Sequence, residues 1–136
     1  MAASLVVTII GPDRPGLVSL LSDRGKAHDA SWAESRMASL AGHFAGMVRF
    51  EVAAAKAEAL AVSLRELEAT GLRVTIAHGE MVASPAGVRR VRLDLLGQDR
   101  PGIVRDISRV LADAGISIDE LETEIASGAM SGEAMF

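Results

Sequence analysis

The sequence predicts an α+β protein made of two tandem units, each with the element order β-α-β-β-α-β. The main observation is an internal repeat: residues 11–18 (GPDRPGLV) match residues 97–104 (GQDRPGIV) at six of eight positions, at an offset of 86 residues from Gly11 to Gly97. Two further observations are an apolar alternation before each segment and helical apolar spacing after it. Because the offset continues in phase through later positions, we interpret the chain as a duplication.

Each unit is expected to open with a strand, a loop and a helix. Residues 5–10 and 91–95 show the period-two pattern of a half-buried strand. Apolar residues follow each Pro-Gly pair at helical spacing, which predicts a helix after the loop. Both helices should end at Asp29 and Gly115, equivalent positions that tolerate the left-handed conformation common after a helix C-terminus.

The rest of the first unit is predicted to be a hairpin, a helix and a strand. Residues 30–40 and 43–53 flank the turn dipeptide Ala41-Gly42, which favours a β-hairpin. Together with the helix and the strand that follow the hairpin, the element order is the ferredoxin-like pattern, an antiparallel sheet with both helices on one face. The last two elements are an Ala- and Glu-rich helix at 56–70, closed by Gly71, and a short strand at 73–77.

The repeat predicts a complete domain at 1–80, a linker at 81–87 and an incomplete second domain at 88–136. At the repeat offset Phe136 corresponds to Phe50, so the second unit is expected to be truncated after its third strand begins. Burying one apolar side chain contributes about 1.5–3 kcal/mol. We therefore do not expect the second unit to fold alone. Two explanations stay open: the sequence is shortened, or the first unit or a second chain completes the second unit.

Composition excludes several classes of protein. A net charge of −4 argues against a nucleic-acid surface, which needs clustered cations, and the basic cluster at 89–92 is interpreted as a solvated strand start. The chain has no cysteine, which suits a reducing compartment. The apolar start lacks the flanks of a signal peptide, and no run is long enough for a membrane helix. We expect a soluble cytoplasmic protein without membrane or direct nucleic-acid contact.

The candidate site is the pair of Asp-Arg-Pro-Gly loops. Free N–H groups of a first helical turn attract a carboxylate, and Asp13 and Asp99 could meet an ammonium group, so a free amino acid would satisfy both charges. The alternative is local: the aspartates could cap the helices, and the glycines could only permit the turn. Neither capping nor packing explains the repeated arginines Arg14 and Arg100, which slightly favours the ligand hypothesis, although the sequence gives them no definite role.

Strand-start residues extend this hypothesis. Ser31 and Ser117 are expected near the loops across the sheet edge, where they could hydrogen-bond a ligand, although serine is also common where a helix gives way to a strand. Trp32 is interpreted as a core residue, with the wall of a pocket as the alternative.

No catalytic or metal constellation is found in the sequence. The three histidines lack the spacing of a metal site, and no nucleophile motif occurs. Glu120, Glu122 and Glu124 line one strand face, which we interpret as a solvated or partner-facing surface, with metal binding as the weaker alternative. We expect no catalytic residues, no metal and no cofactor, and hence no enzyme.

At these residues the chain resembles a known family. The two Asp-Arg-Pro-Gly loops in β-α-β-β-α-β units resemble ACT domains, small regulatory modules that sense amino acids. Residues 11–18, 30–38 (ASWAESRMA) and 40–46 (LAGHFAG) look like the tandem-ACT proteins of the glycine cleavage system transcriptional repressor type.

The resemblance implies a non-enzymatic regulator that senses a small amino acid, with glycine as one candidate, forms a homodimer and contacts a transcription factor. A ligand-free dimerisation or interaction module is the alternative. Many ligand-binding ACT units carry asparagine where this chain has Ser31 and Ser117. The expected ligand-binding residues are Asp13, Pro15, Gly16, Leu17, Ser31, Asp99, Pro101, Gly102, Ile103 and Ser117.

Overall fold

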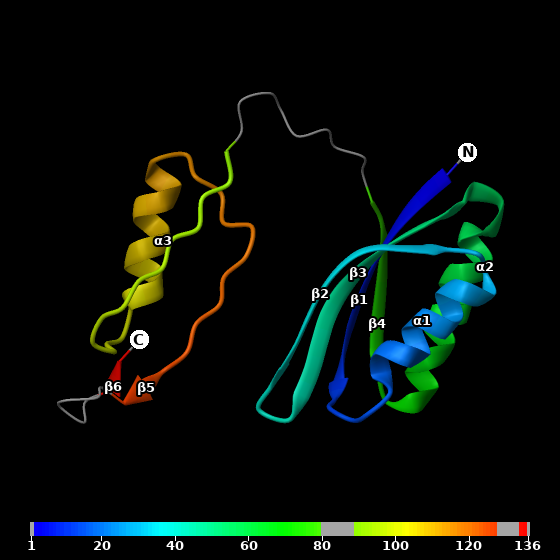
Figure 1. Ribbon diagram of the computed structural model, residues 1–136, viewed down its shortest axis with the longest axis horizontal. Coiled ribbons are helices and arrows are strands. Elements are labelled where there is room, and N and C mark those ends of the chain that lie inside the picture. The colour runs from blue at the N-terminus through cyan, green and yellow to red at the C-terminus, as the bar shows by residue number, and fades with distance from the viewer. Residues whose placement is uncertain (1, 80–88, 128–133, 136) are drawn as a thin grey trace. The chain divides into compact units, whose positions relative to one another are not determined.

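A computed structural model describes residues 2–79, 89–127 and 134–135 (Figure 1). The chain divides into two compact units, Met1–Ser84 and Pro85–Phe136. Among the described residues, no helix combines the length and the apolar character needed to cross a bilayer.

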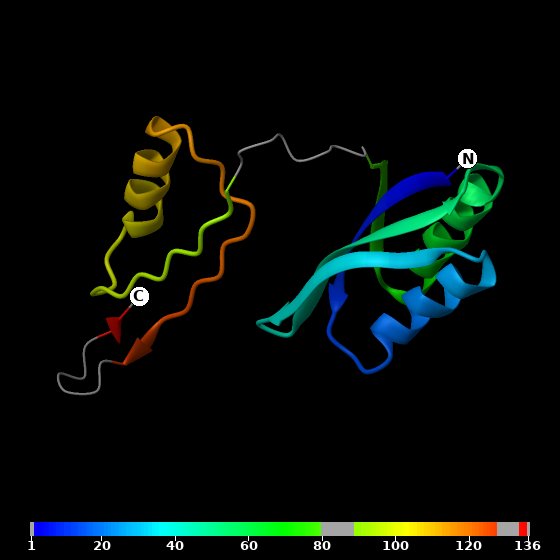
Figure 2. The same ribbon diagram turned by 45° about the horizontal axis from the view of Figure 1, so that its top comes forward.

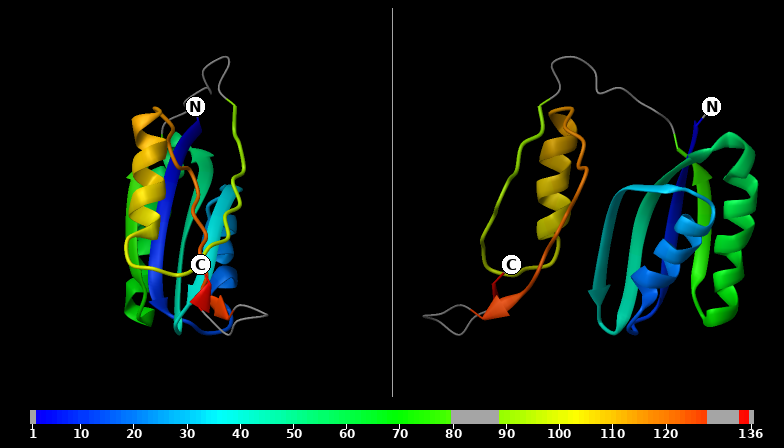
Figure 3. Two further views of the ribbon diagram at one scale, coloured as in Figure 1. Left: turned by 90° about the vertical axis from the view of Figure 1, so that its left-hand side faces the viewer. Right: turned by 45° about the vertical axis from the view of Figure 1, so that its right-hand side comes forward.

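The first unit has the predicted ferredoxin-like architecture. Its four strands form one sheet in the order β2-β3-β1-β4, and every neighbouring pair is antiparallel. Both helices lie on the same face of this sheet (Figure 3). The elements are β1 (Ala2–Pro12), α1 (Leu17–Ala27), β2 (Ser31–Leu40), β3 (His43–Ala53), α2 (Ala54–Arg65), the 3-10 helix η1 (Glu66–Thr70) and β4 (Arg73–His78).

The predicted turns are confirmed by backbone conformation. Asp29 follows α1 with a φ of 53°, and the hairpin turn has φ values of 50° at Ala41 and 80° at Gly42. Two successive positive φ angles are typical of the two-residue turns that match the twist of a hairpin. The predicted helix at 56–70 begins earlier, at Ala54, and its last turn tightens into η1. In η1, Leu67 is buried and Thr70 donates a hydrogen bond to the Leu67 carbonyl.

The core of the first unit lies between the sheet and its two helices. It is aliphatic apart from Phe50, as the low aromatic content predicts. In the middle of β1, Leu5, Val7 and Ile9 face the helices and are at most 1% exposed, whereas Val6 is half-buried and Thr8 and Ile10 are exposed on the opposite face. The buried cluster consists of Leu5, Val7, Ile9, Leu17, Leu21, Val48, Phe50, Val52, Leu60, Leu64, Leu67 and Leu72.

The second unit repeats the loop and helix. Helix α3 (Ile103–Asp113) follows the second Pro-Gly pair as predicted, and Gly115 beyond it has a φ of 75°. Two short strands, β5 (Ala126–Ser127) and β6 (Ala134–Met135), form an antiparallel pair.

The predicted strand at 91–95 is not formed, and this expectation was wrong. Val91, Leu93 and Leu95 are 82%, 58% and 52% exposed and join no ladder, whereas their counterparts Leu5, Val7 and Ile9 are at most 1% exposed. In the first unit these residues belong to β1, which pairs with β3 and β4. At the repeat offset, the counterparts of β3 and β4 begin only after residue 128. Of these counterparts, the described residues include only β6, which corresponds to part of β3.

Candidate functional site

The loop between β1 and α1 ends in a glycine that starts the helix. Gly16 is the N-cap residue of α1, with φ 90° and ψ 2°, and Gly102 takes the same position before α3 with φ 83° and ψ 6°. No side chain caps either helix. A Cβ placed on either glycine would have no neighbour within 4 Å, so open space lies over both helix starts. The first-turn N–H groups therefore keep their partial positive charge without a side-chain partner.

Asp13 does not cap α1, so the capping alternative is wrong for this residue. Its Oδ2 atom instead accepts a hydrogen bond from the Ser39 hydroxyl at 2.8 Å. Its backbone N–H donates to the Gly42 carbonyl at 2.9 Å. These contacts join the loop to the tip of the β2–β3 hairpin, and the two segments lie side by side in Figure 2.

Arg100 gains a role that the sequence did not indicate. Its Nη1 atom lies 2.9 Å from Oδ2 of Asp106 in the first turn of α3. Leu20 occupies the position of Asp106 in the first unit, so Arg14 cannot form the same ion pair. The two arginines thus match in sequence but differ in surroundings.

Leu17 is only 2% exposed, because its side chain belongs to the core. It can offer a ligand its backbone N–H group but not its side chain. Pro15 and Gly16 are exposed, as are Asp99, Pro101 and Gly102, and Ile103 is half-buried.

Ser31 does not lie near the loop, and the sequence-based placement was wrong. Ser31 pairs with Glu51, which pairs with Ser4 near the start of β1, whereas the loop follows Pro12 at the other end. Eight strand residues span about 26 Å. The chain leaves α1 at the end of the sheet opposite Gly16, so β2 begins far from the loop and returns to it only at Ser39. Ser117 likewise follows the C-terminal end of α3, opposite Gly102.

Trp32 combines the two roles that were considered for it. It packs against the core with its ring edge-on to Phe50, at a centroid distance of 5.5 Å and an interplanar angle of 80°. It also forms a wall of an open cavity of about 370 Å³ between the end of α1 and the start of β2. The cavity is lined by Ser22, Gly25, Lys26, Asp29, Ala30, Ser31, Trp32 and Phe50.

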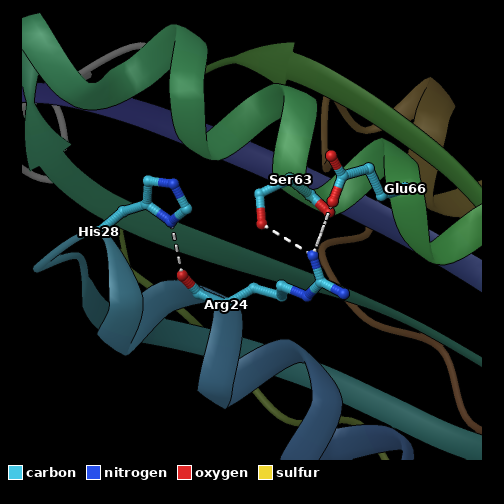
Figure 4. Close-up of polar contacts among 4 residues, drawn as sticks. All are labelled: Arg24, His28, Ser63 and Glu66. Carbon is cyan, nitrogen blue, oxygen red and sulfur yellow. Dashed lines mark hydrogen bonds and ion pairs between the residues drawn. The ribbon is translucent and has the colours of Figure 1, made fainter.

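Several charged groups of the first unit are engaged in structural contacts. Figure 4 shows Arg24 of α1 reaching the end of α2 and the start of η1, where its Nη1 atom donates to the Ser63 hydroxyl at 3.2 Å and to Glu66 Oε2 at 2.9 Å. His28 Nδ1 bonds the Arg24 carbonyl at 2.9 Å. This network joins the two helices and leaves the β1–α1 loop untouched.

Three ion pairs shift the pKa values of two groups, Asp29 and Arg49. The hydrogen bond and charge of Lys56, at 2.5 Å, lower the pKa of Asp29. Hydrogen bonds to Glu51 at 2.7 Å and Glu34 at 2.9 Å raise the pKa of Arg49 on the open face of the sheet. Within residues 2–79, 89–127 and 134–135, no three His, Asp or Glu side chains gather to hold a metal ion, so Glu120, Glu122 and Glu124 form no such group.

These features define a class: an antiparallel ferredoxin-like domain whose first strand leads through an Asp-Arg-Pro-Gly loop into an uncapped helix, with the loop and helix repeated in the same chain. The ACT domain family matches residues 3–77, and it matches again at residues 91–136. The chain belongs to the ACT domain family, whose members bind amino acids and serve regulation.

Solved structures agree with this assignment. An unknown protein from Galdieria sulphuraria is similar with a TM-score of 0.79 and 29% identity, over 99% of this chain and 78% of that one. A candidate glycine cleavage system transcriptional repressor has a TM-score of 0.67 and 16% identity, over 99% and 77% of the two chains. At that identity the likeness shows the fold alone. The search of curated protein sequences returns no match.

Proposed function

We propose that this protein is a cytoplasmic, non-enzymatic regulator that binds a small amino acid at its Asp-Arg-Pro-Gly loops and acts on a protein partner. One observation carries the proposal: the same loop occurs twice, each time before a helix whose first-turn N–H groups no side chain caps. The acidic side chains of Asp13 and Asp99 stand three residues before these helix-starting glycines.

The chemistry of the loop fits a zwitterion. The α-carboxylate would accept hydrogen bonds from the N–H groups at Gly16 and Leu17, where positive partial charge favours an anion. The ammonium group would pair with the Asp13 carboxylate. Glycine has few atoms. At the upper limit of binding free energy per non-hydrogen atom, it could still gain about −7 kcal/mol on binding. A coupling of about 1–3 kcal/mol is sufficient to change a partner's affinity.

The proposal includes a homodimer, which gives Ser31 a role. In the described sheet β2 is an edge strand that neighbours only β3. Antiparallel pairing of the β2 edges of two copies would bring Ser31 of one copy to the loop end of the other. Residues that lie at opposite ends of one sheet would then meet at the same site.

The fold likeness to a candidate glycine cleavage system transcriptional repressor supports glycine as the first ligand to test. It also supports a transcription factor as the class of protein partner. The proposed ligand contacts remain the loop residues Asp13, Pro15, Gly16, Leu17, Asp99, Pro101, Gly102 and Ile103, with Ser31 and Ser117 supplied across an interface.

Calorimetry with glycine and a panel of free amino acids tests the function. We expect binding heat with at least one amino acid, and its loss in the double variant Asp13→Ala, Asp99→Ala. Asp23→Ala is the matched control, because Asp23 is an exposed aspartate on the outside of α1. Absence of heat with every amino acid would overturn the proposal.

A ligand-free interaction module is the second candidate. The observation that favours it is the open face of the sheet, where Ile10 and Met47 are 45% and 47% exposed. Sedimentation velocity with and without amino acids separates the two candidates. If no amino acid changes the stability of the dimer, the result supports the interaction module. If one amino acid changes it, the result supports the regulator.

A further inference from the structure

The loop and the hairpin tip of the first unit are joined by two hydrogen bonds from the same residue. The Asp13 side chain accepts from Ser39 at 2.8 Å, and the Asp13 backbone donates to Gly42 at 2.9 Å. The partners lie 26 and 29 residues further along the chain, so these are tertiary contacts. The hairpin turn itself is fixed by positive φ angles at Ala41 and Gly42.

The second repeat keeps the aspartate but not the serine. At the repeat offset Asp99 corresponds to Asp13 and Gly128 to Gly42, whereas Ile125 stands in place of Ser39. An isoleucine side chain has no donor. The second loop therefore cannot form the contact that orients the carboxylate in the first loop.

We infer that Ser39 is a positioning residue for Asp13, and that the two loops are unequal sites of which the first binds an amino acid more tightly. This inference rests on the function proposed above. A carboxylate has two oxygens, and Ser39 holds Oδ2 so that Oδ1 can face an ammonium group. Asp99 must lose side-chain freedom on binding, which costs affinity.

The same contact couples ligand occupancy to the β2 edge. Ser39 lies on β2 next to its end at Leu40, and β2 is an edge of the sheet. A ligand that fixes Asp13 also fixes the end of β2, the strand that would meet a second copy. The first repeat is thus the one that transmits binding to assembly.

Calorimetry of full-length single-site variants tests the inference. We expect Asp13→Ala to remove the tighter binding event and Asp99→Ala to leave it. Ser39→Ala should weaken it by about 3- to 10-fold, the range for an ordinary hydrogen bond, because solvent screens the charge of this exposed contact. Ser39→Thr, which keeps the hydroxyl, should restore it.

Ser35→Ala is the matched control, because Ser35 is an exposed serine on the same face of β2. The urea midpoint followed by Trp32 fluorescence should be alike in the Ser39 and Ser35 variants, which separates positioning from a loss of stability. Two equal sites, or an Asp99→Ala variant that loses the tighter event, would overturn the inference.

Amide hydrogen exchange tests the anchor without any ligand. Ser39→Ala should speed exchange at the Asp13 N–H several-fold, and Ser35→Ala should not. If no amino acid binds the wild-type chain, the proposed function fails, and the two unequal sites fail with it. An unchanged Asp13 exchange rate would reject the anchor itself even if the function stands.

Discussion

The two units share a loop and a helix but differ in what surrounds them. Helix α1 buries Leu17 and Leu21 against the sheet, whereas no residue of α3 is buried in the described structure. Apolar strand residues that are inaccessible in the first unit are more than half exposed at the equivalent positions of the second. A glycine and a proline are enough to start a helix locally, but a strand needs partners before it becomes part of a sheet.

The largest effect on stability should come from truncating the side chain at equivalent positions of α1 and α3. Leu21→Ala empties a fully buried site, and we expect a loss of about 2–5 kcal/mol in the free energy of unfolding of the first unit. Ile107→Ala, at the repeat offset, removes a half-buried side chain and should cost at most about 1 kcal/mol. Urea unfolding followed by circular dichroism measures both, and Trp32 fluorescence isolates the first unit. Equal losses would mean that the second unit has a packed core as well.

A smaller loss is expected from adding one methyl group at Gly25. A Cβ there would lie 2.6 Å from Cε1 of the buried Phe50 ring, so the ring or the helix must shift to admit it. We expect Gly25→Ala to cost about 1–3 kcal/mol, although alanine favours a helix. The second repeat carries Leu111 at this position, so Leu111→Ala is the paired control and should have little effect. Stabilisation by Gly25→Ala, measured by urea unfolding, would contradict the tight helix–sheet contact.

A gain in stability is expected at the hairpin turn. Ala41 has a φ of 50°, which is unfavourable for alanine and acceptable for asparagine. Ala41→Asn creates the Asn-Gly pair typical of this turn and should raise the free energy of unfolding by about 0.5–1 kcal/mol. Ala38→Asn, at an exposed strand position of the same hairpin, should give no gain. Thermal unfolding compares the two variants with the wild type.

The smallest effect concerns the Asp29–Lys56 pair, and it depends on pH. Because Lys56 lowers the pKa of Asp29 in the folded state, the pair stabilises the first unit above the unfolded-state pKa. This stability is lost as the pH falls through the folded-state pKa. Lys56→Met should therefore be destabilising near neutral pH and lose its effect in acid. Lys26→Met, at another exposed lysine, should show no such pH dependence when unfolding is followed by Trp32 fluorescence.

The candidate site was partly predictable. The repeated loop, the glycine helix starts and the acid at Asp13 follow from the sequence, because each depends on a short run of residues. The Ser39–Asp13 contact could not be predicted from the sequence, because it joins residues 26 positions apart. Ser31 was misplaced because its distance from the loop depends on which end of the sheet β2 enters. The antiparallel hairpin with its turn at Ala41-Gly42 was the available signal, since it returns the end of β2 to the loop.

The sequence by itself determined the duplication, the order of elements in the first unit and the turns at Asp29, Ala41-Gly42 and Gly71, because apolar periodicity and left-handed residues act over a few positions. Only the tertiary structure decided which serine meets Asp13, that Trp32 is both a core contact and a cavity wall, and that residues 91–95 stay out of a sheet. Those outcomes depend on strand pairing and burial between distant segments, and no local pattern contains that information.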